Sequence, residues 1–478
     1  MAFPTLDTRA AAALGAALRR VGYSESRISD MVGEDAWSNE PDDVAVAARR
    51  IAPTRLGTVV RALFLQLAVR RDELAGALGA RAVAALDALG LTEPGETIRS
   101  RGRVLTVGEL LVLSDDHPSR EDDVPRDYVA AYTPTSRILD CLTPRERGVR
   151  ALDVGTGSGV QAILAARHAS HVVATDINPR ALTFTALNAA LNGLGNVETR
   201  QGSLFEAVAG EQFDLITCNA PYVVSPENRF AYRDSGLRGD EVTRVVVEAA
   251  AAHLAENGYA TVVGSWLGVD EETADERPYA WTQALPECDA WILSVWESAP
   301  LEHAAAWNRE HAGEPGRFEA ALESWTAYLA ELGAGWVSEG AILLHRRSGR
   351  RHGTRVDGID EDALEAAGAQ VLRAFAGRAE LARLRRDELI DRKLALAMRA
   401  ALERELGPRA RPAAVARVQL LGGTSSTIET TADALEIVDG LDGSTPLRRL
   451  LRGASPATRR SALRLCRELV ELGAARLL

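Results

Sequence analysis

Lysine, cysteine and long apolar runs are scarce in this chain of 478 residues. Lys393 is the sole lysine, which we interpret as a coding bias because it affects every segment alike. The four cysteines are scattered without a CxxC pair, so the sequence predicts neither disulfides nor a metal site. No apolar run reaches the roughly 18 residues of a transmembrane helix. These absences exclude a disulfide-stapled or membrane-spanning protein and predict a cytoplasmic one.

The charge balance is acidic, with a formal net charge of −12 and a pI of about 5.4. No global positive field therefore draws the protein to nucleic acid, although a local basic patch stays open. The length and a hydrophobic content of 46% predict a globular protein of two to four domains. The Ala-rich start lacks a basic segment ahead of a strongly apolar core and continues as an amphipathic helix, so we expect no signal peptide.

The N-terminal domain is predicted to span residues 1–125. Short amphipathic helices precede two strand-like runs in TIRSRGRVLTVGELLVLSDD. Helices followed by a small hairpin are typical of a winged-helix module. A helical cap packed on the next domain would show the same pattern.

Alternating strands and helices characterise residues 126–349. Short apolar strands separated by helical segments predict an α/β domain, with a doubly wound, Rossmann-like sheet covered by helices on both faces. Seven strands are expected, within VRALDVGTG, HVVATDIN, NVETRQG, FDLITCNAPY, GYATVVGSW, AWILSVWES and WVSEGAILLHRRS. Residues 350–410 are then predicted as a helical connector, and residues 411–478 as a small winged-helix-like domain.

A glycine-rich turn follows the first predicted strand in ALDVGTGSGVQAILAARH. The third glycine comes one position too early for the dinucleotide fingerprint, and an acid precedes the first glycine. The stretch resembles motif I of class I methyltransferases, which use S-adenosylmethionine (SAM). The resemblance implies that SAM is the cofactor and that Asp153, Gly155, Thr156, Gly157 and Gly159 hold it.

Two further strand ends carry cofactor candidates. Asp176 closes the second strand, where doubly wound nucleotide binders place a carboxylate on the ribose hydroxyls, and Ile177 follows it. A helix start at Asn178 explains the same residues structurally. Ser203 and Leu204 follow the third strand, where methyltransferases hold adenine. Many members have aspartate in place of Ser203, and serine is the weaker acceptor.

The fourth strand ends in the tetrapeptide NAPY, formed by Asn219, Ala220, Pro221 and Tyr222. It resembles the (N/D)PPY motif of amino-group methyltransferases, including release-factor glutamine and adenine N6 methyltransferases. The resemblance implies that the Asn219 side-chain oxygen and the Ala220 carbonyl accept hydrogen bonds from a planar nitrogen beside the cofactor, and that Asn219 also contacts the cofactor. Tyr222 would stack on the substrate and Pro221 would stiffen the turn. The departure is Ala220, which replaces the first proline but keeps the carbonyl.

Three other features have both a functional and a structural interpretation. The loop of residues 223–238 offers Tyr232, Arg233 and Asp234 as substrate contacts, although solvated loop residues would look identical. Seven of the eight tryptophans lie between Trp266 and Trp336, and we interpret them as local core in preference to a substrate-stacking surface. The basic run HRRSGRRHGTR is a candidate phosphate contact or, preferably, a solvated strand end.

Together these patterns predict a SAM-dependent N-methyltransferase. The flanking domains favour a macromolecular acceptor, either a protein glutamine or an adenine in structured RNA or DNA, and the acidic net charge favours protein. The alternatives are a methyltransferase for a small natural product and a catalytically inactive, SAM-sensing winged-helix regulator. The sequence leaves the oligomeric state open.

Overall fold

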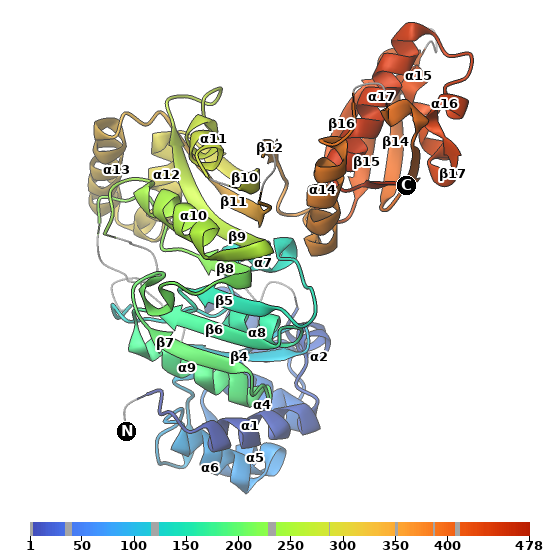
Figure 1. The fold of residues 1–478 in the computed structure, drawn as a ribbon. Helices are drawn as coiled ribbons and strands as arrows, with labels where there is room; N and C mark the ends of the chain where they lie inside the picture. The colour runs from blue at the N-terminus through green and yellow to red at the C-terminus, as the bar shows by residue number, and fades with distance from the viewer. Residues whose placement is uncertain are drawn as a thin grey trace.

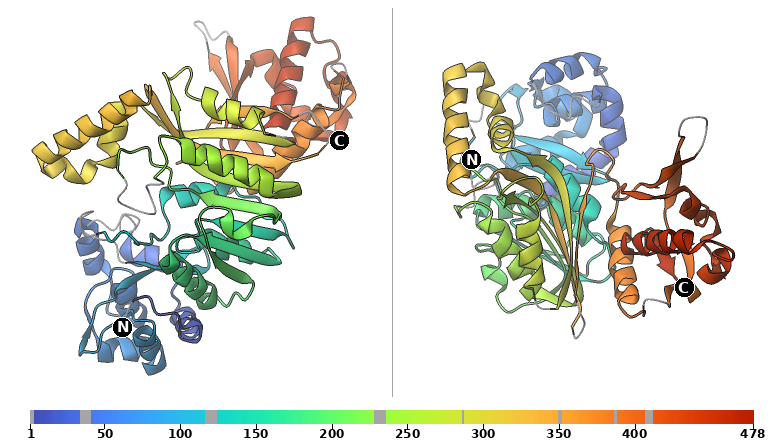
Figure 2. Two further views of the ribbon diagram at one scale, coloured as in Figure 1. Left: turned by 60° about the vertical axis from the view of Figure 1, so that its left-hand side comes forward. Right: turned by 90° about the horizontal axis from the view of Figure 1, so that it is seen from above.

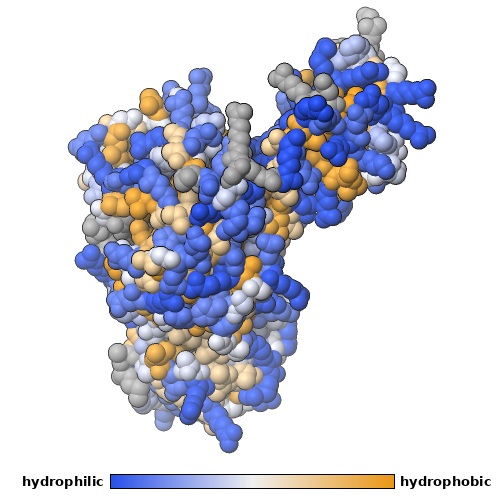
Figure 3. All heavy atoms as spheres, viewed as in Figure 1, coloured by the Kyte–Doolittle hydropathy of each residue, from blue (hydrophilic) through white to orange (hydrophobic). Residues whose placement is uncertain are grey.

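The computed structural model describes residues 3–33, 41–115, 124–227, 236–285, 287–348, 352–385, 388–406 and 412–478. Three parts follow one another along the chain: a helical N-terminal lobe, a central α/β sheet and a C-terminal lobe (Figure 1). Within the described residues, no helix is long and apolar enough to cross a membrane. Hydrophilic residues cover most of the face shown in Figure 3.

The N-terminal lobe consists of short helices and two small β-ladders. Its helices are α1 (Thr8–Val21), α2 (Glu25–Val32), α3 (Pro41–Arg50), α4 (Arg55–Leu63), α5 (Arg71–Leu78) and α6 (Ala80–Ala88). Its strands are β1 (Val69–Arg70), β2 (Thr97–Ile98), β3 (Gly102–Val107) and β4 (Leu110–Asp115), paired antiparallel as β1–β2 and β3–β4. The predicted hairpin is therefore present as β3–β4.

This hairpin is a packing element and does not project as a wing. Every residue of β3 and β4 is buried, and the core of the lobe includes Phe184 and Leu187 from the central part of the chain. Asn188 pairs with the outer edge of β4: its Oδ1 accepts from Leu113 N–H at 2.7 Å, and its Nδ2 donates to the Leu113 carbonyl at 2.8 Å. The lobe is thus a cap on the central domain, and the winged-helix alternative is not confirmed.

The central sheet has eight strands in the order β12-β10-β11-β9-β8-β5-β6-β7. They are β5 (Arg150–Val154), β6 (His171–Asp176), β7 (Val197–Gln201), β8 (Phe213–Asn219), β9 (Leu254–Gly268), β10 (Cys288–Ser298), β11 (Trp336–Arg346) and β12 (Thr354–Gly358). All neighbouring strands are parallel except at β11, which runs antiparallel to both β9 and β10. The carboxyl ends of β5, β6, β7 and β8 therefore meet at one edge.

The predicted count of seven strands is one too few. All seven predicted strands are present, and β12 adds an eighth at the edge by pairing parallel with β10. The prediction of a helical connector over residues 350–410 is also wrong, because β12 and two further strands lie in it. The strand β12 was missed because it is only five residues long and half-buried, so its apolar pattern is weak.

Helices cover both sides of this twisted sheet (Figure 2). They are α7 (Pro134–Leu142), α8 (Val160–Ala166), α9 (Pro179–Leu191), α10 (Glu241–His253), α11 (Glu276–Gln283), α12 (Pro300–Trp307) and α13 (Pro315–Glu331), with short 3₁₀ turns η3 (Glu206–Val208) and η4 (Arg309–Gly313). The glycine turn leads into α8, and a proline at the first position starts α7, α9, α12 and α13.

The C-terminal lobe joins the sheet through α14 (Gly368–Leu381), whose Phe375 ring lies against Tyr259 and His345 of the sheet. The lobe continues with η5 (Leu389–Asp391), β13 (Lys393–Leu396), β14 (Arg399–Leu406), β15 (Pro412–Leu421), β16 (Thr427–Thr431), α15 (Ala432–Leu435), η7 (Val438–Gly440), β17 (Asp442–Pro446), α16 (Leu447–Leu450), α17 (Pro456–Glu471) and β18 (Ala475–Leu477). Its strands form two three-stranded sheets. The winged-helix assignment of this lobe and the predicted domain boundaries stay predictions.

Candidate active site

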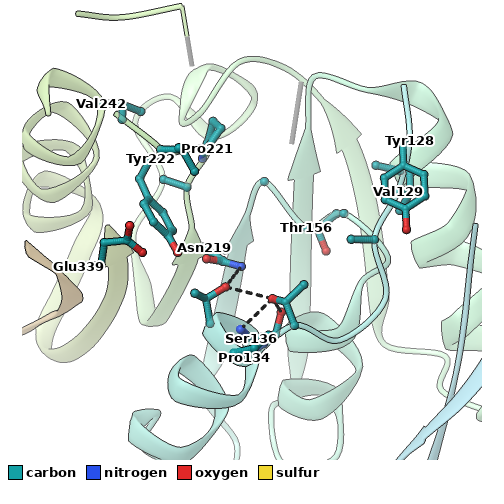
Figure 4. Close-up of a pocket in the computed structure, with 18 of the residues that line it drawn as sticks. Tyr128, Val129, Pro134, Ser136, Thr156, Asn219, Pro221, Tyr222, Val242 and Glu339 are labelled. Atoms are coloured by element: carbon teal, nitrogen blue, oxygen red, sulfur yellow. Dashed lines mark hydrogen bonds between the residues drawn. The ribbon is translucent and has the colours of Figure 1, made fainter. Parts of the chain in front are cut away.

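A cavity of about 1260 Å³ opens at the carboxyl ends of β5, β6 and β8. Open α/β sheets bind ligands in the crevice at the carboxyl ends of their strands, which is this edge. The cavity brings together nearly all the residues singled out in the sequence: Asp153, Gly155, Thr156, Gly157, Asp176, Ile177, Ser203, Leu204, Asn219, Ala220, Pro221 and Tyr222 line it. Figure 4 shows part of this wall, with the tetrapeptide on one side and Thr156 on the other.

The glycine turn after β5 has two open glycines and one packed glycine. Gly155, Gly157 and Gly159 all have positive φ angles, of 65°, 55° and 81°. A Cβ atom on Gly155 or Gly157 would meet no atom within 4 Å, and both residues line the cavity, so a side chain there would enter its space. A Cβ on Gly159 would lie 2.8 Å from Thr185 on α9. Gly159 therefore allows α8 and α9 to pack closely. It was predicted to contact the cofactor, but it is not among the residues that line the cavity.

Asp153 is buried and holds the glycine turn together. Its Oδ2 accepts from Thr156 Oγ1 at 2.6 Å and from Ala162 N–H at 3.2 Å, and its Oδ1 accepts from Thr217 Oγ1 at 2.9 Å. Burial raises the pKa of Asp153 to about 6, against the opposing effect of these hydrogen bonds. The carboxylate thus ties β5 to β8 and to the start of α8, besides lining the cavity.

Asp176 connects the end of β6 to the glycine turn. Its Oδ2 accepts from Gly157 N–H at 2.9 Å, and its Oδ1 accepts from Asn178 N–H at 2.8 Å. Burial raises the pKa of Asp176, while backbone hydrogen bonds oppose the rise. Asn178 caps α9 by accepting from Arg180 N–H, so the capping interpretation and the cavity position both hold. The Ile177 side chain is 61% exposed, which leaves an apolar surface free at the cavity wall.

The turn after β7 contributes Ser203 and Leu204 to the wall. Leu204 has a positive φ of 47°, an uncommon conformation for a leucine. Its carbonyl accepts from Thr175 Oγ1 at 3.3 Å, which ties this turn to the end of β6. Ser203 N–H donates to Glu206 in the following turn at 3.3 Å.

Asn219 presents an unpaired oxygen at the end of β8. Its Nδ2 donates to Thr135 Oγ1 at 3.3 Å, whereas its Oδ1 is buried without a hydrogen-bond partner. Thr135 Oγ1 in turn lies 3.0 Å from Thr133 Oγ1, which caps α7 (Figure 4). A buried amide oxygen without a partner costs free energy, so this atom is a candidate acceptor for a ligand.

Tyr222 lies deep in the wall with only 5% of its surface exposed. Burial raises the pKa of its hydroxyl well above the usual value, and nearby Glu339 adds to the rise while a hydrogen bond with Thr135 opposes it. Ser265 Oγ donates to the Tyr222 carbonyl at 2.6 Å and holds the turn against β9. The ring faces the interior of the cavity beside Asn219 (Figure 4).

Several cavity residues escaped the sequence interpretation. Thr135 lines the cavity, and the chain that precedes α7 contacts the glycine turn, where Ser158 Oγ donates to the Ala131 carbonyl at 3.2 Å. On the other side, Trp296, His303, Trp307 and Glu339 line the cavity. No local motif marks these residues, because they come from four separate elements. Trp296 and Trp307 thus line the cavity, although Trp296 also packs against the apolar core of the sheet.

Two further sequence candidates are the loop residues and the basic run. Tyr232, Arg233 and Asp234 fall outside the described residues. In the basic run, His345 stacks on Tyr259 with ring centroids 4.3 Å apart, and Arg347 is buried in an ion pair with Asp289. These two side chains are structural, which contradicts both a phosphate contact and a solvated strand end for this part of the run.

Comparisons with known proteins identify the family of this domain. Residues 133–268 match the Methyltransferase small domain family. Over 231 residues the chain is 32% identical to the release factor glutamine methyltransferase of Cereibacter sphaeroides, covering 45% of this chain and 77% of that protein. The chain belongs to the class I methyltransferase family of these proteins.

Two other members of the methyltransferase family match shorter segments. The chain is 36% identical over 129 residues to the release factor glutamine methyltransferase of Xylella fastidiosa, covering 24% of this chain and 47% of that protein. It is 35% identical over 180 residues to the ribosomal protein uL3 glutamine methyltransferase of Bradyrhizobium diazoefficiens, covering 33% and 56%. The chain thus spans about half the length of these two relatives.

Proposed function

We propose that this chain transfers a methyl group from SAM to the side-chain nitrogen of a glutamine in a protein substrate. The observation that carries the proposal is the Asn219 Oδ1 atom, a buried acceptor without a partner in the cavity wall. The relatives named as release factor and ribosomal protein uL3 glutamine methyltransferases support an amide nitrogen as the acceptor. Neither adenine nor a small natural product has such support.

The cavity has the features that SAM requires. Gly155 and Gly157 leave open space for a ligand to approach the backbone. Asp176, next to them, carries the carboxylate that would receive the ribose hydroxyls, and the exposed Ile177 with Leu204 offers apolar surface for adenine. When bound, SAM supplies an electrophilic methyl group on its sulfonium.

Catalysis by this chain would consist of positioning the acceptor nitrogen. Asn219 Oδ1 and the Ala220 carbonyl would accept hydrogen bonds from the two N–H groups of the amide. These hydrogen bonds would draw the nitrogen lone pair out of conjugation. The Tyr222 ring would cover the planar group, and the buried wall would exclude water. Thr135 holds the Asn219 amide in the required orientation because it accepts from Nδ2.

Methyl-labelled SAM tests the proposal directly. We expect label to be incorporated into the side-chain amide of a glutamine when the protein is incubated with purified release factor or ribosomal protein uL3. Asn219→Ala should lower the rate constant by roughly 100-fold or more while SAM affinity stays nearly intact, since an aimed hydrogen bond in a desolvated site contributes about 3 kcal/mol. Asn219→Asp, which still accepts, should be milder.

Two results would contradict the proposal. The first is label that appears only in RNA, DNA or small molecules when a fractionated cell extract replaces the purified proteins. The second is an Asn219→Ala protein that binds SAM and retains most of its turnover, because the tetrapeptide would then be only a turn.

A further inference from the structure

Glu339 is a largely buried carboxyl group in the cavity wall at the end where the tetrapeptide lies. Its side chain, on β11, is 13% exposed. Figure 4 shows it beside the Tyr222 ring, on the same side of the cavity as Asn219. Two residues earlier on the same face of β11, Val337 packs in an apolar cluster. Core packing therefore does not explain why Glu339, the next residue on this face, carries a carboxyl group.

The described neighbours of Glu339 do not supply a positive charge. Trp307 Nε1 donates to Glu339 Oε1 at 3.1 Å, and His303 Nδ1 lies 3.8 Å from the same oxygen. The His303 Nε2 atom lies 3.1 Å from the Val224 carbonyl. A carbonyl only accepts, so the ring proton is on Nε2 and Nδ1 turns a lone pair toward Glu339. Burial lowers the pKa of His303 to about 4, so the ring is neutral near pH 7.

A carboxylate in this position is poorly compensated. In the described part of the chain, no arginine or lysine lies within ion-pair distance of Glu339, and Trp307 provides its single side-chain hydrogen bond. Burial accordingly raises the pKa of Glu339 to about 7. Removing a carboxylate from water costs several kcal/mol unless a partner compensates it, and buried ionisable groups in a cleft are candidates for ligand contacts.

We propose that Glu339 is a specificity residue whose carboxylate accepts a hydrogen bond from a cationic nitrogen, guanidinium or ammonium, carried by the methyl acceptor next to the methylated amide. The inference rests on the proposed function for the identity of that amide. The rings of Trp296 and Trp307 also line this part of the cavity and suit a flat guanidinium. The predicted acceptor is therefore a glutamine with a basic residue adjacent to it in sequence.

Two matched peptides separate this contact from general binding. In one peptide an arginine adjoins the glutamine, and in the other citrulline replaces that arginine with nearly the same shape but no charge. Binding is measured by calorimetry on the full chain saturated with S-adenosylhomocysteine, and methyl transfer is measured with labelled SAM. We expect the unmodified protein to bind the arginine peptide roughly 10- to 100-fold more tightly, as a charge-assisted hydrogen bond implies.

Glu339→Gln should abolish this preference and leave SAM affinity unchanged. Glu310→Gln is the matched control, because it removes the same charge from an exposed residue of η4 that does not line the cavity. This control should keep the full preference for the arginine peptide. Equal affinity for the two peptides in the unmodified protein, or no measurable binding of either, would overturn the proposal, as would an undiminished preference in Glu339→Gln.

The two proposals fail in distinguishable ways. A charge preference without methyl transfer to either peptide would support the role of Glu339 and contradict glutamine methylation. Transfer to both peptides at equal kcat/KM would support glutamine methylation and contradict the role of Glu339. If Glu339 had only a structural role, Glu339→Gln would lower the affinity for both peptides by the same factor.

The preference should also depend on pH with a defined sign. Because the pKa of Glu339 is raised to about 7, its carboxylate is charged above pH 7, and the preference should fall as pH drops from 8 to 6. The other ionisable groups at this end are Tyr222, Glu297, Glu302, His303 and Arg309. Tyr222 and His303 stay neutral across this range because burial shifts their pKa values away from it. If the Glu339→Gln protein loses this pH dependence, the titrating group is Glu339.

Trp307→Phe provides a second readout. It keeps an aromatic ring but removes the hydrogen bond that stabilises the charged carboxylate. We therefore expect the pH midpoint of the preference to move upward in this variant. A downward shift would contradict the arrangement described here.

Discussion

At the scale of single residues, the candidate site depends on which way the Asn219 amide is turned. Thr135 fixes this orientation, because its hydroxyl oxygen accepts from Asn219 Nδ2 and leaves Oδ1 without a partner. The same hydroxyl reaches Thr133 and Tyr222. Thr135 thus acts through Asn219 and is a positioning residue.

Thr135→Val should lower kcat roughly 10-fold with little change in the KM for SAM. Valine has the same shape as threonine but cannot accept, so the Asn219 amide loses its fixed orientation. Thr135→Ser keeps the hydroxyl and should recover most of the rate. Steady-state methyl transfer checks both variants. Equal losses in the valine and serine variants would show that packing, and not the hydrogen bond, is what matters.

The glycine turn offers a contrast between two neighbouring glycines. Gly155→Ala and Gly159→Ala both place a Cβ on a residue with positive φ, which costs about 1–2 kcal/mol. Only at Gly159 does the new atom collide, 2.8 Å from Thr185, so Gly159→Ala should lower the free energy of unfolding by a further 1–3 kcal/mol or so. Gly155→Ala should instead weaken SAM binding at least 10-fold.

Denaturant unfolding and calorimetry separate these two effects. Gly157→Ala serves as a second open position and should behave like Gly155→Ala. A folded Gly155→Ala protein with unchanged SAM affinity would remove the turn from the proposed cofactor site.

At the scale of elements, α9 serves two neighbours at once. Its first turn follows Asp176 at the cavity, and its later residues form part of the core of the N-terminal lobe. Asn188 is completely buried and fixes this joint, since it bonds both backbone groups of Leu113 and donates to the Ser158 carbonyl at 2.7 Å. On the edge of β4 away from β3, the Asn188 amide thus makes the hydrogen bonds that a further strand would otherwise make with Leu113.

Asn188→Leu should lower the free energy of unfolding by roughly 3 kcal/mol or more. The substitution leaves a buried N–H and two carbonyls without partners, each of which costs about 1–3 kcal/mol. Asn192→Leu is the matched control, because Asn192 bonds Leu111 in the same way but is only partly buried. Denaturant unfolding should show a smaller decrease in the free energy of unfolding for Asn192→Leu than for Asn188→Leu. Equal losses would contradict the dominant role of burial.

At the scale of the whole molecule, the central domain shares its core with both lobes. Phe184 and Leu187 of α9 are completely buried and belong to the core of the N-terminal lobe. On the other side, one continuous apolar core runs from the sheet through Phe375 into the C-terminal lobe. Arg355 of β12 adds ion pairs to Glu468 and Glu471 of α17. The three parts of the chain are therefore interdependent.

We expect a fragment of residues 126–349 to be unstable. It would expose the apolar face of α9 and would lack β12, so its burial of apolar surface would fall well below that of the full chain. Thermal unfolding followed by circular dichroism checks this expectation, with the full chain as reference. A cooperative transition at the temperature of the full chain, together with unchanged SAM affinity, would show that the lobes are dispensable for folding.

The features of this protein that could be predicted are those encoded by residues close together in the sequence. Seven strands and the N-terminal hairpin followed from apolar runs bounded by turn residues, because local periodicity reflects which face of a strand is buried. The residues after β5, β7 and β8 were found through their resemblance to methyltransferase motifs, and the position of Asp176 after β6 followed from the way parallel strands bring their carboxyl ends to one edge. β12 was missed because a short, half-buried strand leaves little pattern.

The sequence by itself determined the α/β class, the family resemblance and the cofactor and tetrapeptide candidates. Only the tertiary structure decided that Gly159 packs on α9, that Thr135 orients Asn219, and that Glu339 stands in the acceptor end of the cavity. Thr135, His303 and Glu339 lie far from the tetrapeptide along the chain and meet it through packing. A residue's pKa and free hydrogen-bonding atoms depend on burial and on neighbours in space, and these exist only once the chain has folded.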